Sequence, residues 1–437
     1  MPDDLDSSGR RAGRLLGWSL AAVRPAAVPS AWSEPAGLTA VFESPLAGRR
    51  NQRSGCVVSA TAGDRIGSAL FRSLAFGTFG SAAWRLRSLA GPRVWRILVD
   101  VGKRVSTVTD EADEAKAEIP AGVVGYLIAT AARAPSILNT QPWRFEVGQH
   151  RIELYADFDR KLRVDLIGRE LVISCGAALF GLRLAIRSLG YLPVVELLPD
   201  PSRPRLLASV TLGAAQAPTA ADRRMLEALP HRHTHRGPFD AAPLPAGLLA
   251  GLQHDAQAEG ATLALVDRAH GYEKLADIMD AVSRRQDSDP RSWADMVQWT
   301  RDTTTAAHDG VPAHTFTAGA DRHRGTLPQR DFDLGRGLGE LAADGPPPAA
   351  TAVLLTPGDA RADWLCAGQA LHRVLADAAS RWVFASIHTR PLEAEGVRAL
   401  IRDRLVLSGA PQLILQLGVA RATQVTARRP PSDLLEG

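Results

Sequence analysis

The chain has 437 residues, 45% of them hydrophobic and 22% charged, which is enough for a sizeable core and predicts two to three domains or a duplicated one. Its net charge of +4 conceals an asymmetry, because residues 1–104 carry 15 Arg and Lys against 7 Asp and Glu, and the remainder carries 36 against 40. The basic excess therefore belongs to the N-terminal region. Since no nucleic-acid-binding motif accompanies it, we expect no nucleic-acid partner.

Residues 1–104 are expected to form a disordered or poorly packed extension, because Gly, Ser, Pro and Arg interrupt each candidate helix. Residues 9–23 resemble a twin-arginine export signal, but their short apolar core is broken by Arg24 and lacks a good cleavage site. No run reaches the roughly 18 apolar residues that a membrane span requires. The three cysteines lack Cys-x-x-Cys spacing, so we expect no disulfide framework, no zinc site and a cytoplasmic location.

The stretch Ala134–Phe145 reads Ala-Pro-Ser-Ile-Leu-Asn-Thr-Gln-Pro-Trp-Arg-Phe and follows an apolar run that is expected to be helical. Pro135 is expected to end that helix, because proline has no amide hydrogen and disfavours the α region in the preceding residue. Pro135 and Pro142 fix two φ angles, and polar side chains lie between them. The loop suits contact with the edge of a flat polar ring. A plain helix end followed by a turn is the alternative.

The next elements are predicted from periodicity and turn residues. Residues 145–156 alternate apolar and polar around a Gly-Gln turn and predict a β-hairpin. Residues 169–189 are apolar nearly all round and predict a buried helix, with Gly190 after its end. Within this helix, Cys175-Gly-Ala-Ala would let another backbone approach closely. After the helix, Leu206–Leu212 predicts a strand ended by Gly213.

Part of this unit recurs later in the chain. Ala367-Gly-Gln-Ala-Leu371 matches Cys175-Gly-Ala-Ala-Leu179 and opens a second apolar helix at 364–382, and the strand 412–418 matches the strand before Gly213. A repeat of this length indicates a duplicated domain, although alanine-rich helices also resemble one another by chance. Residues 268–345 have no counterpart in the first half and are expected to be an insertion, with helices at Tyr272–Arg285 and Trp293–Thr304 and an irregular His- and Gly-rich stretch.

Between the two halves, Leu229–Phe239 carries three histidines at alternate positions, and two of them lie inside Arg232-His-Thr-His-Arg236. An extended segment would place His231 and His235 on one face, which invites a metal hypothesis, but no Asp, Glu or Cys accompanies them at ligand spacing. The alternatives are an Arg-x-Thr-x-Arg phosphate motif, in which guanidinium groups match phosphate oxygens, and a solvated basic turn.

The loop from Pro135 resembles the flavin loop of the nitroreductase superfamily, and residues 105–437 resemble its internally duplicated Acg-type subfamily. The motifs occur in the expected order, ending with Arg-Arg-Pro at 428–430. This resemblance implies an α+β nitroreductase-like fold in which two fused halves, 105–222 and 223–437, form a pseudo-dimer with helices around antiparallel sheets. Departures from the pattern include histidines at both variable positions of the Arg motif, Trp382 where glycine is usual and Arg390 where glutamine is typical.

The resemblance also implies the cofactor and its ligands. We expect FMN to be bound through ten residues: Pro135, Ser136, Asn139, Gln141, Arg232, Thr234, Arg236, Ser386, Arg428 and Arg429. The arginines and Thr234 would hold the phosphate. We expect no metal, and we assign no catalytic side chain because the flavin carries the chemistry.

The function that follows is an NAD(P)H-dependent, FMN-binding oxidoreductase of the nitroreductase type that reduces a nitroaromatic or quinone. The alternative is a protein that stores or sequesters FMN without turnover, beneath a lid expected within Asp287–Phe332. Because one chain holds one copy of each flavin motif, in opposite halves, we expect one FMN per chain, with the site complete in a monomer that is also free to dimerise.

Overall fold

The computed structural model describes residues 117–286, 288–302, 306–318, 327–328, 330–338, 340–341, 347–420 and 426–436. All of them belong to the second of two compact units, which begins at Ala112. The predictions for the extension 1–104 and for parts of the insertion lie outside the described residues.

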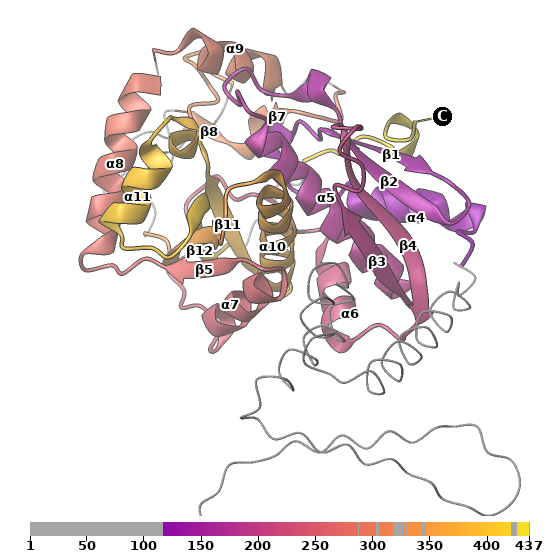
Figure 1. Ribbon diagram of the computed structural model, residues 1–437. Helices are drawn as coiled ribbons and strands as arrows, with labels where there is room; N and C mark the ends of the chain where they lie inside the picture. The colour runs from indigo at the N-terminus through magenta and orange to yellow at the C-terminus, as the bar shows by residue number, and fades with distance from the viewer. Residues whose placement is uncertain are drawn as a thin grey trace, which may run out of the picture. The chain divides into compact units, whose positions relative to one another are not determined.

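The first half is an antiparallel sheet with two helices (Figure 1). Its elements are α4 (Ala121–Ala131), β1 (Trp143–Val147), β2 (Arg151–Ala156), α5 (Arg169–Ser188), β3 (Tyr191–Leu197) and β4 (Leu206–Ala215). The strand order is β1-β2-β4-β3, and all three pairings are antiparallel. The expected hairpin forms because Trp143, Phe145, Ile152 and Leu154 place their side chains in the core, and its turn lies at Gly148.

The second half repeats this order of elements around its own antiparallel sheet. Its elements are α7 (Leu248–Ala258), β5 (Thr262–Leu265), β10 (Ala350–Thr356), α10 (Arg361–Ala379), β11 (Val383–His388) and β12 (Ala410–Val419). The strand order, β5-β10-β12-β11, is the order of the first sheet with each strand replaced by its counterpart. Helix α6 (Ala220–Ala228) joins the halves, and α11 (Val397–Arg404) lies between β11 and β12.

The two long helices α5 and α10 cross at the centre, between the sheets (Figure 1). Glycines at matching positions make the crossing possible. A Cβ on Gly176 would lie 2.3 Å from the carbonyl oxygen of Leu365, and one on Gly368 would lie 1.9 Å from that of Ile173. Helix α5 is long and apolar enough to cross a membrane, yet 83% of its apolar window is buried inside the protein. It is the core helix that its sequence predicts.

Several predicted boundaries differ from the structure. Helix α4 ends at Ala131, upstream of Pro135, so the proline is not the residue that ends it. The backbone amide of the C-cap residue, Ala132, still donates to the Ile128 carbonyl. Strand β3 was not expected. Strand β4 continues through Gly213 to Ala215. A Cβ added at Gly213 would lie 2.8 Å from Val194 Cγ2 on the neighbouring strand β3. The glycine therefore permits close strand approach and does not end the strand.

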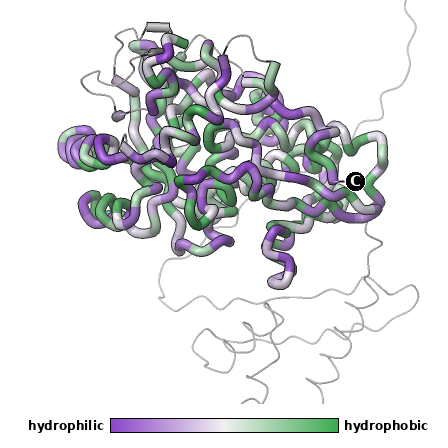
Figure 2. The backbone as a smooth tube through the Cα atoms, turned by 90° about the horizontal axis from the view of Figure 1, so that it is seen from above, coloured by the Kyte–Doolittle hydropathy of each residue, from purple (hydrophilic) through white to green (hydrophobic). Residues whose placement is uncertain are grey.

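The insertion packs on both halves in the part that the structure describes. Helix α8 (Gly271–Gln286) places Leu275 and Met279 against β10 and β12. Helix α9 (Pro290–Trp299) places Met296 and Trp299 against Leu138 of the first half. It ends at Trp299 and not at Thr304, because Thr300 turns to an extended conformation. In Figure 2 hydrophilic and hydrophobic residues alternate along the peripheral helices, as expected when one helix face packs on a core.

The short elements complete the description. They are 3-10 turns at Ile137–Asn139, Phe158–Arg160, Ala313–Thr315, Arg390–Glu393 (η4) and Pro431–Asp433, and two-residue strands β6 (Thr300–Arg301), β7 (Val311–Pro312), β8 (Thr317–Ala318) and β9 (Glu340–Leu341). The pairs β6–β7 and β8–β9 are both parallel.

Candidate functional site

A cleft containing about 800 Å³ of empty space, part of it open to solvent, lies where the halves and the insertion meet. The first half contributes the loop 135–138 and Glu170, Ile173 and Ser174 of α5. The second half contributes Thr234, Arg236 and the end of β11 with η4, and the insertion contributes Pro328, Arg330 and Phe332. Five of the ten predicted cofactor ligands therefore line one cleft: Pro135, Ser136, Thr234, Arg236 and Ser386.

The Arg-His-Thr-His-Arg motif is held as an added strand beside β11. Thr234 pairs in parallel with Ala385, and the His235 amide donates to the Ala385 carbonyl at 2.9 Å. In extended backbone alternate side chains face opposite sides. Thr234 and Arg236 accordingly line the cleft, while His233 packs on Phe384 with ring centroids 4.5 Å apart.

The three histidines lie on the side of the motif that packs against aromatic rings. His231 stacks on Trp382, with centroids 5.1 Å apart, and His235 packs on Phe239 at 4.6 Å. Burial lowers the pKa of His233 to about 4. No group of three or more metal-ligating side chains occurs among the described residues. One nitrogen of each ring lies within hydrogen-bond distance of a backbone carbonyl, and His233 Nε2 is buried without a partner among the described residues.

Both arginines of the motif belong to a cluster with Arg133 and Arg428. Burial lowers the pKa of Arg232, Arg236 and Arg428, and repulsion from neighbouring arginines, Arg133 and Arg236 among them, lowers the pKa of Arg232 and Arg428 further. Burial is the first cause, and it lowers the pKa of Arg232 and Arg236 to about 10 each. In the described part of the chain none of Arg232, Arg236 and Arg428 forms an ion pair.

Arg232 is 4% exposed and its guanidinium is incompletely satisfied. Its Nη2 donates to the Arg133 carbonyl at 3.0 Å, but its Nε and Nη1, like the Nε of Arg428, are buried without a partner among the described residues. Buried donors that carry charge are costly when unpaired. The cluster therefore has the character of an anion site.

The loop of Asn139 and Gln141 carries unusual backbone strain. Leu138, Asn139 and Gln141 have φ of +46°, +53° and +49°, in the left-handed region that favours glycine. Sequence inspection predicted a pinned loop but not these conformations. Strain of this kind persists only where the surroundings impose it, and it concentrates at functional sites.

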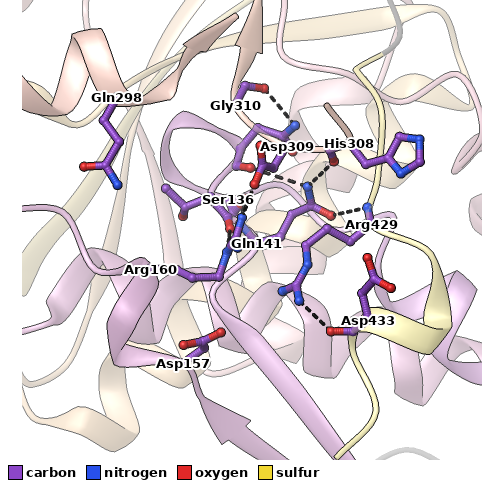
Figure 3. Close-up of polar contacts among 12 residues, drawn as sticks. Ser136, Gln141, Asp157, Arg160, Gln298, His308, Asp309, Gly310, Arg429 and Asp433 are labelled. Atoms are coloured by element: carbon purple, nitrogen blue, oxygen red, sulfur yellow. Dashed lines mark hydrogen bonds and ion pairs between the residues drawn. The ribbon is translucent and has the colours of Figure 1, made fainter. Parts of the chain in front are cut away.

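Hydrogen bonds around the loop supply that constraint (Figure 3). Asn139 Nδ2 donates to the carbonyls of Gly310 and Ala427 at 2.9 and 3.2 Å, and Gln141 Nε2 donates to that of His308 at 2.8 Å. Gln141 Oε1 accepts the Arg429 amide at 2.9 Å. These two side chains thus tie the insertion and the C-terminal segment to the first half. Asn139 Oδ1 remains buried without a partner among the described residues.

Neighbouring Arg428 and Arg429 point into different surroundings. Arg428 faces Arg232 and Arg236, whereas the Arg429 guanidinium donates to the Asp433 carbonyl and lies among the charges of Arg160 and Asp157. The structure brings Arg428 to the arginine cluster but not Arg429.

Two charged residues of the cleft, Glu170 and Arg330, were not singled out from the sequence. Glu170 opens a helix that was interpreted as core, and Arg330 lies in the insertion. Neither position carries a motif.

At the other end of the cleft, His388 is held between the Pro328 carbonyl and Gln416 Oε1 at 3.2 and 3.0 Å, and burial lowers its pKa to about 4.

Known proteins resemble this chain over most of its length. No family model matches. A Mycobacterium tuberculosis protein named "Putative NAD(P)H nitroreductase" is 32% identical over 306 residues, covering 69% of this chain and 86% of that protein. An uncharacterized protein of the same organism is 30% identical, covering 71% and 91%, and the "Putative NAD(P)H nitroreductase acg" is 28% identical, covering 71% and 95%.

Two solved structures are similar at lower identity. A nitroreductase-like family protein from Bacillus cereus matches with a TM-score of 0.30 at 15% identity, covering 51% of this chain and 98% of its own. A putative nitroreductase from Anabaena variabilis matches with a TM-score of 0.27 at 16% identity, covering 68% and 73%. Such TM-scores are too low to define the fold, so the assignment rests on the sequence relatives. By its identity to them, and over nearly their full length, the chain belongs to the nitroreductase-like family.

Proposed function

We propose that this chain is an FMN-binding oxidoreductase of the nitroreductase type that uses NAD(P)H to reduce a small electron acceptor such as a nitroaromatic or quinone. FMN, when bound, supplies the centre that accepts a hydride and passes electrons on. The observation that carries the proposal is the buried arginine cluster, which has no carboxylate partner among the described residues and reaches the cleft through Arg236.

The residues present fit a phosphate-bearing cofactor. A phosphate dianion offers several acceptors, and Arg232 and Arg428 hold buried guanidinium nitrogens without partners among the described residues. Thr234 adds a hydroxyl that lines the same cleft. We therefore assign Arg232, Thr234, Arg236 and Arg428 to the phosphate, and leave Arg429 out because its side chain is directed to the C-terminal turn.

For the ring we assign the loop of Pro135 and Ser136 together with Ser386 and the residues that follow it. The strained loop positions these groups without reorganisation when the cofactor binds. Asn139 and Gln141 act on the site by fixing the loop, and Asn139 Oδ1 is left as an acceptor for the cofactor.

The matching order of elements supports a duplication in which the halves form a pseudo-dimer and one chain carries one composite site. The loop comes from the first half and the arginine motif opens the second. Residues 259–261, which join α7 to β5, contain no counterpart of the loop at 135–142.

FMN affinity of Arg236→Ala tests the assignment. Removing one charge-assisted hydrogen bond, worth about 1.5–3 kcal/mol, is expected to weaken binding on the order of 10-fold or more. Arg223→Ala is the matched control, because Arg223 lies on α6 and its guanidinium donates only to the Pro218 carbonyl among the described residues. Fluorescence titration of the protein with FMN measures both, and equal affinity in the two variants would overturn the phosphate assignment.

A second candidate is FMN storage without turnover. It is favoured by the insertion, whose Pro328, Arg330 and Phe332 form part of the cleft wall. Anaerobic addition of NADH or NADPH separates the two functions. Loss of the flavin's yellow absorbance supports the oxidoreductase, and unchanged absorbance supports storage.

A further inference from the structure

Buried carboxyl groups form a wall between the cleft and a second cavity, which contains about 1230 Å³ of empty space, part of it open to solvent. Glu170 lines both cavities, whereas Asp165 and Glu393 line only the second. Asp165 and Glu170 are 5% and 2% exposed, and the Glu393 side chain is 4% exposed. The wall therefore places three buried carboxyls at the second cavity, one of which, Glu170, also reaches the cleft.

Two arginines face these three carboxyls inside the wall. Arg169 Nη2 donates to Glu170, and Arg330 Nη2 donates to Glu393. Asp165 accepts the Leu171 amide at 2.9 Å and caps α5. Lys161, outside the wall, directs its ammonium to the carbonyls of Asp165 and Leu166. The buried part thus has one carboxyl more than it has guanidinium groups, and excess buried charge is relieved by taking up a proton.

The direction of the pKa shifts agrees with this count. Burial raises the pKa of Glu170 to about 7, and it also raises the pKa of Asp165 and Glu393. Neighbouring carboxylates raise the pKa of Glu170 further, while Arg169 and Arg330 oppose the rise. The cluster therefore holds a proton near neutral pH.

We propose that Glu170 is the proton donor to the electron acceptor in the cleft, and that Glu393 and Asp165 return a proton to it from the second cavity. This inference rests on the proposed oxidoreductase function. Reduction of a quinone to a hydroquinone takes up two electrons and two protons. The hydride of NAD(P)H accounts for both electrons and one proton. The other proton leaves the Glu170 carboxyl as its O–H bond breaks, and solvent reprotonates the resulting carboxylate.

Other charged groups at the cleft suit this role less well. Burial lowers the pKa of His388 to about 4, so its ring carries no acidic proton near neutral pH. Arg236, Arg330 and Arg390 line the cleft as permanent cations. Among the described lining residues, Glu170 combines a transferable proton with contact to both cavities.

The first experiment compares two acceptors in Glu170→Gln, which keeps an oxygen for Arg169 but has no acidic proton. After anaerobic reduction of the FMN-loaded protein, the rate with a quinone should fall about 100-fold, a typical value for loss of a general acid. The rate with ferricyanide, which takes up electrons only, should not change. Glu259→Gln is the control, because Glu259 is a buried acid paired with Arg183 and Arg373 that does not line the cleft.

An equal fall with both acceptors would show that Glu170 has a structural role, and unchanged rates with both would show that it has none. Glu170→Asp keeps the acid and should recover part of the quinone rate. Where Glu170→Gln folds poorly, Glu393→Gln replaces it, and a quinone-specific loss is again expected because proton return is interrupted. Failure of NAD(P)H to reduce the wild-type protein would instead refute the proposed function.

A second readout needs no turnover. Because the pKa of Glu170 is raised on folding, the folded protein holds the proton and the unfolded chain releases it between pH 4.5, the ordinary value, and about 7. The free energy of unfolding of the full-length chain should therefore decrease as pH rises through this window. Urea titrations of Glu170→Gln should show a flatter pH dependence than those of wild type and Glu259→Gln. Identical pH profiles would exclude a proton store at Glu170.

Discussion

The two halves of the protein share a scaffold and differ in what is attached to it. Each half is helix, strand, strand, helix, strand, strand, and the two sheets have corresponding strand orders. The first half has the strained loop at 135–142 between α4 and β1, where the second half has a short connection through Gly260. The second half has the arginine motif and the insertion. Loops on equivalent scaffolds therefore create the difference, as is common for functional sites.

The contacts within the scaffold follow the pseudo-symmetry, while those around the cleft do not. Gly176 and Gly368 occupy matching positions and meet each other's helix backbone. By contrast, Asn139 of the first half bonds to Gly310 and Ala427 of the second without a reciprocal pair among the described residues. The comparison predicts that substitutions at the helix crossing affect stability, whereas those at the loop affect one binding site.

The largest expected effect comes from Gly368→Ala. The added Cβ would meet the Ile173 carbonyl at 1.9 Å and the Ala177 amide at 2.7 Å, and both are backbone atoms that cannot rotate away. We expect a loss of at least about 3 kcal/mol in the free energy of unfolding. Gly125→Ala on α4 is the control, since its Cβ would meet nothing within 4 Å, and it should stabilise by about 0.5–1 kcal/mol. Urea unfolding measures both, and similar stabilities would contradict the crossing geometry.

The next prediction concerns the number of sites. If each half contributes one part of a single composite site, one FMN should bind per chain, and Asn139→Ala and Arg236→Ala should each empty it. Flavin absorbance against amino-acid analysis gives the ratio. A value near two would reveal a second, symmetry-related site and refute the division of roles between the halves.

A smaller effect is expected on stability in Asn139→Ala. The substitution removes donors to Gly310 and Ala427 and places alanine at a φ of +53°. Leaving buried carbonyls unpaired costs about 1–3 kcal/mol. Asn139→Gly separates the two causes, because glycine tolerates this φ but also lacks the amide. Equal stability of Asn139→Ala and wild type in urea titrations would show that the loop is not held by this side chain.

The smallest effect is expected for the attachment of the insertion. Asp309 pairs with Arg160 of the first half and with Arg301, and these partners lower its pKa against the effect of burial. Asp309→Asn should speed limited proteolysis within 287–332 several-fold at neutral pH, with FMN slowing it. Asp289→Asn is the control, because Asp289 pairs only with nearby Arg291 among the described residues. Equal cleavage of both variants would mean that Asp309 does not fasten the insertion.

The sequence alone predicted the main elements and a recurrence of their order in the second half. Periodicity located the hairpin and both buried helices, because apolar spacing reflects which face each element buries. The Cys175-Gly-Ala-Ala cluster indicated close backbone approach at Gly176, and two prolines indicated a pinned loop. The arginine motif indicated an anion site because guanidinium groups match phosphate oxygens, with a solvated basic turn as the alternative.

The tertiary structure decided which of these residues meet. Strand alternation beside β11 turned Arg236 toward the cleft and His235 toward Phe239, and the neighbouring side chains of Arg428 and Arg429 point into different surroundings. The carboxyl wall joins α5, η4 and Arg330 of the insertion, which are far apart in sequence. Its charge balance and desolvation arise only when those segments pack together, because a side chain's pKa depends on neighbours that local sequence does not specify.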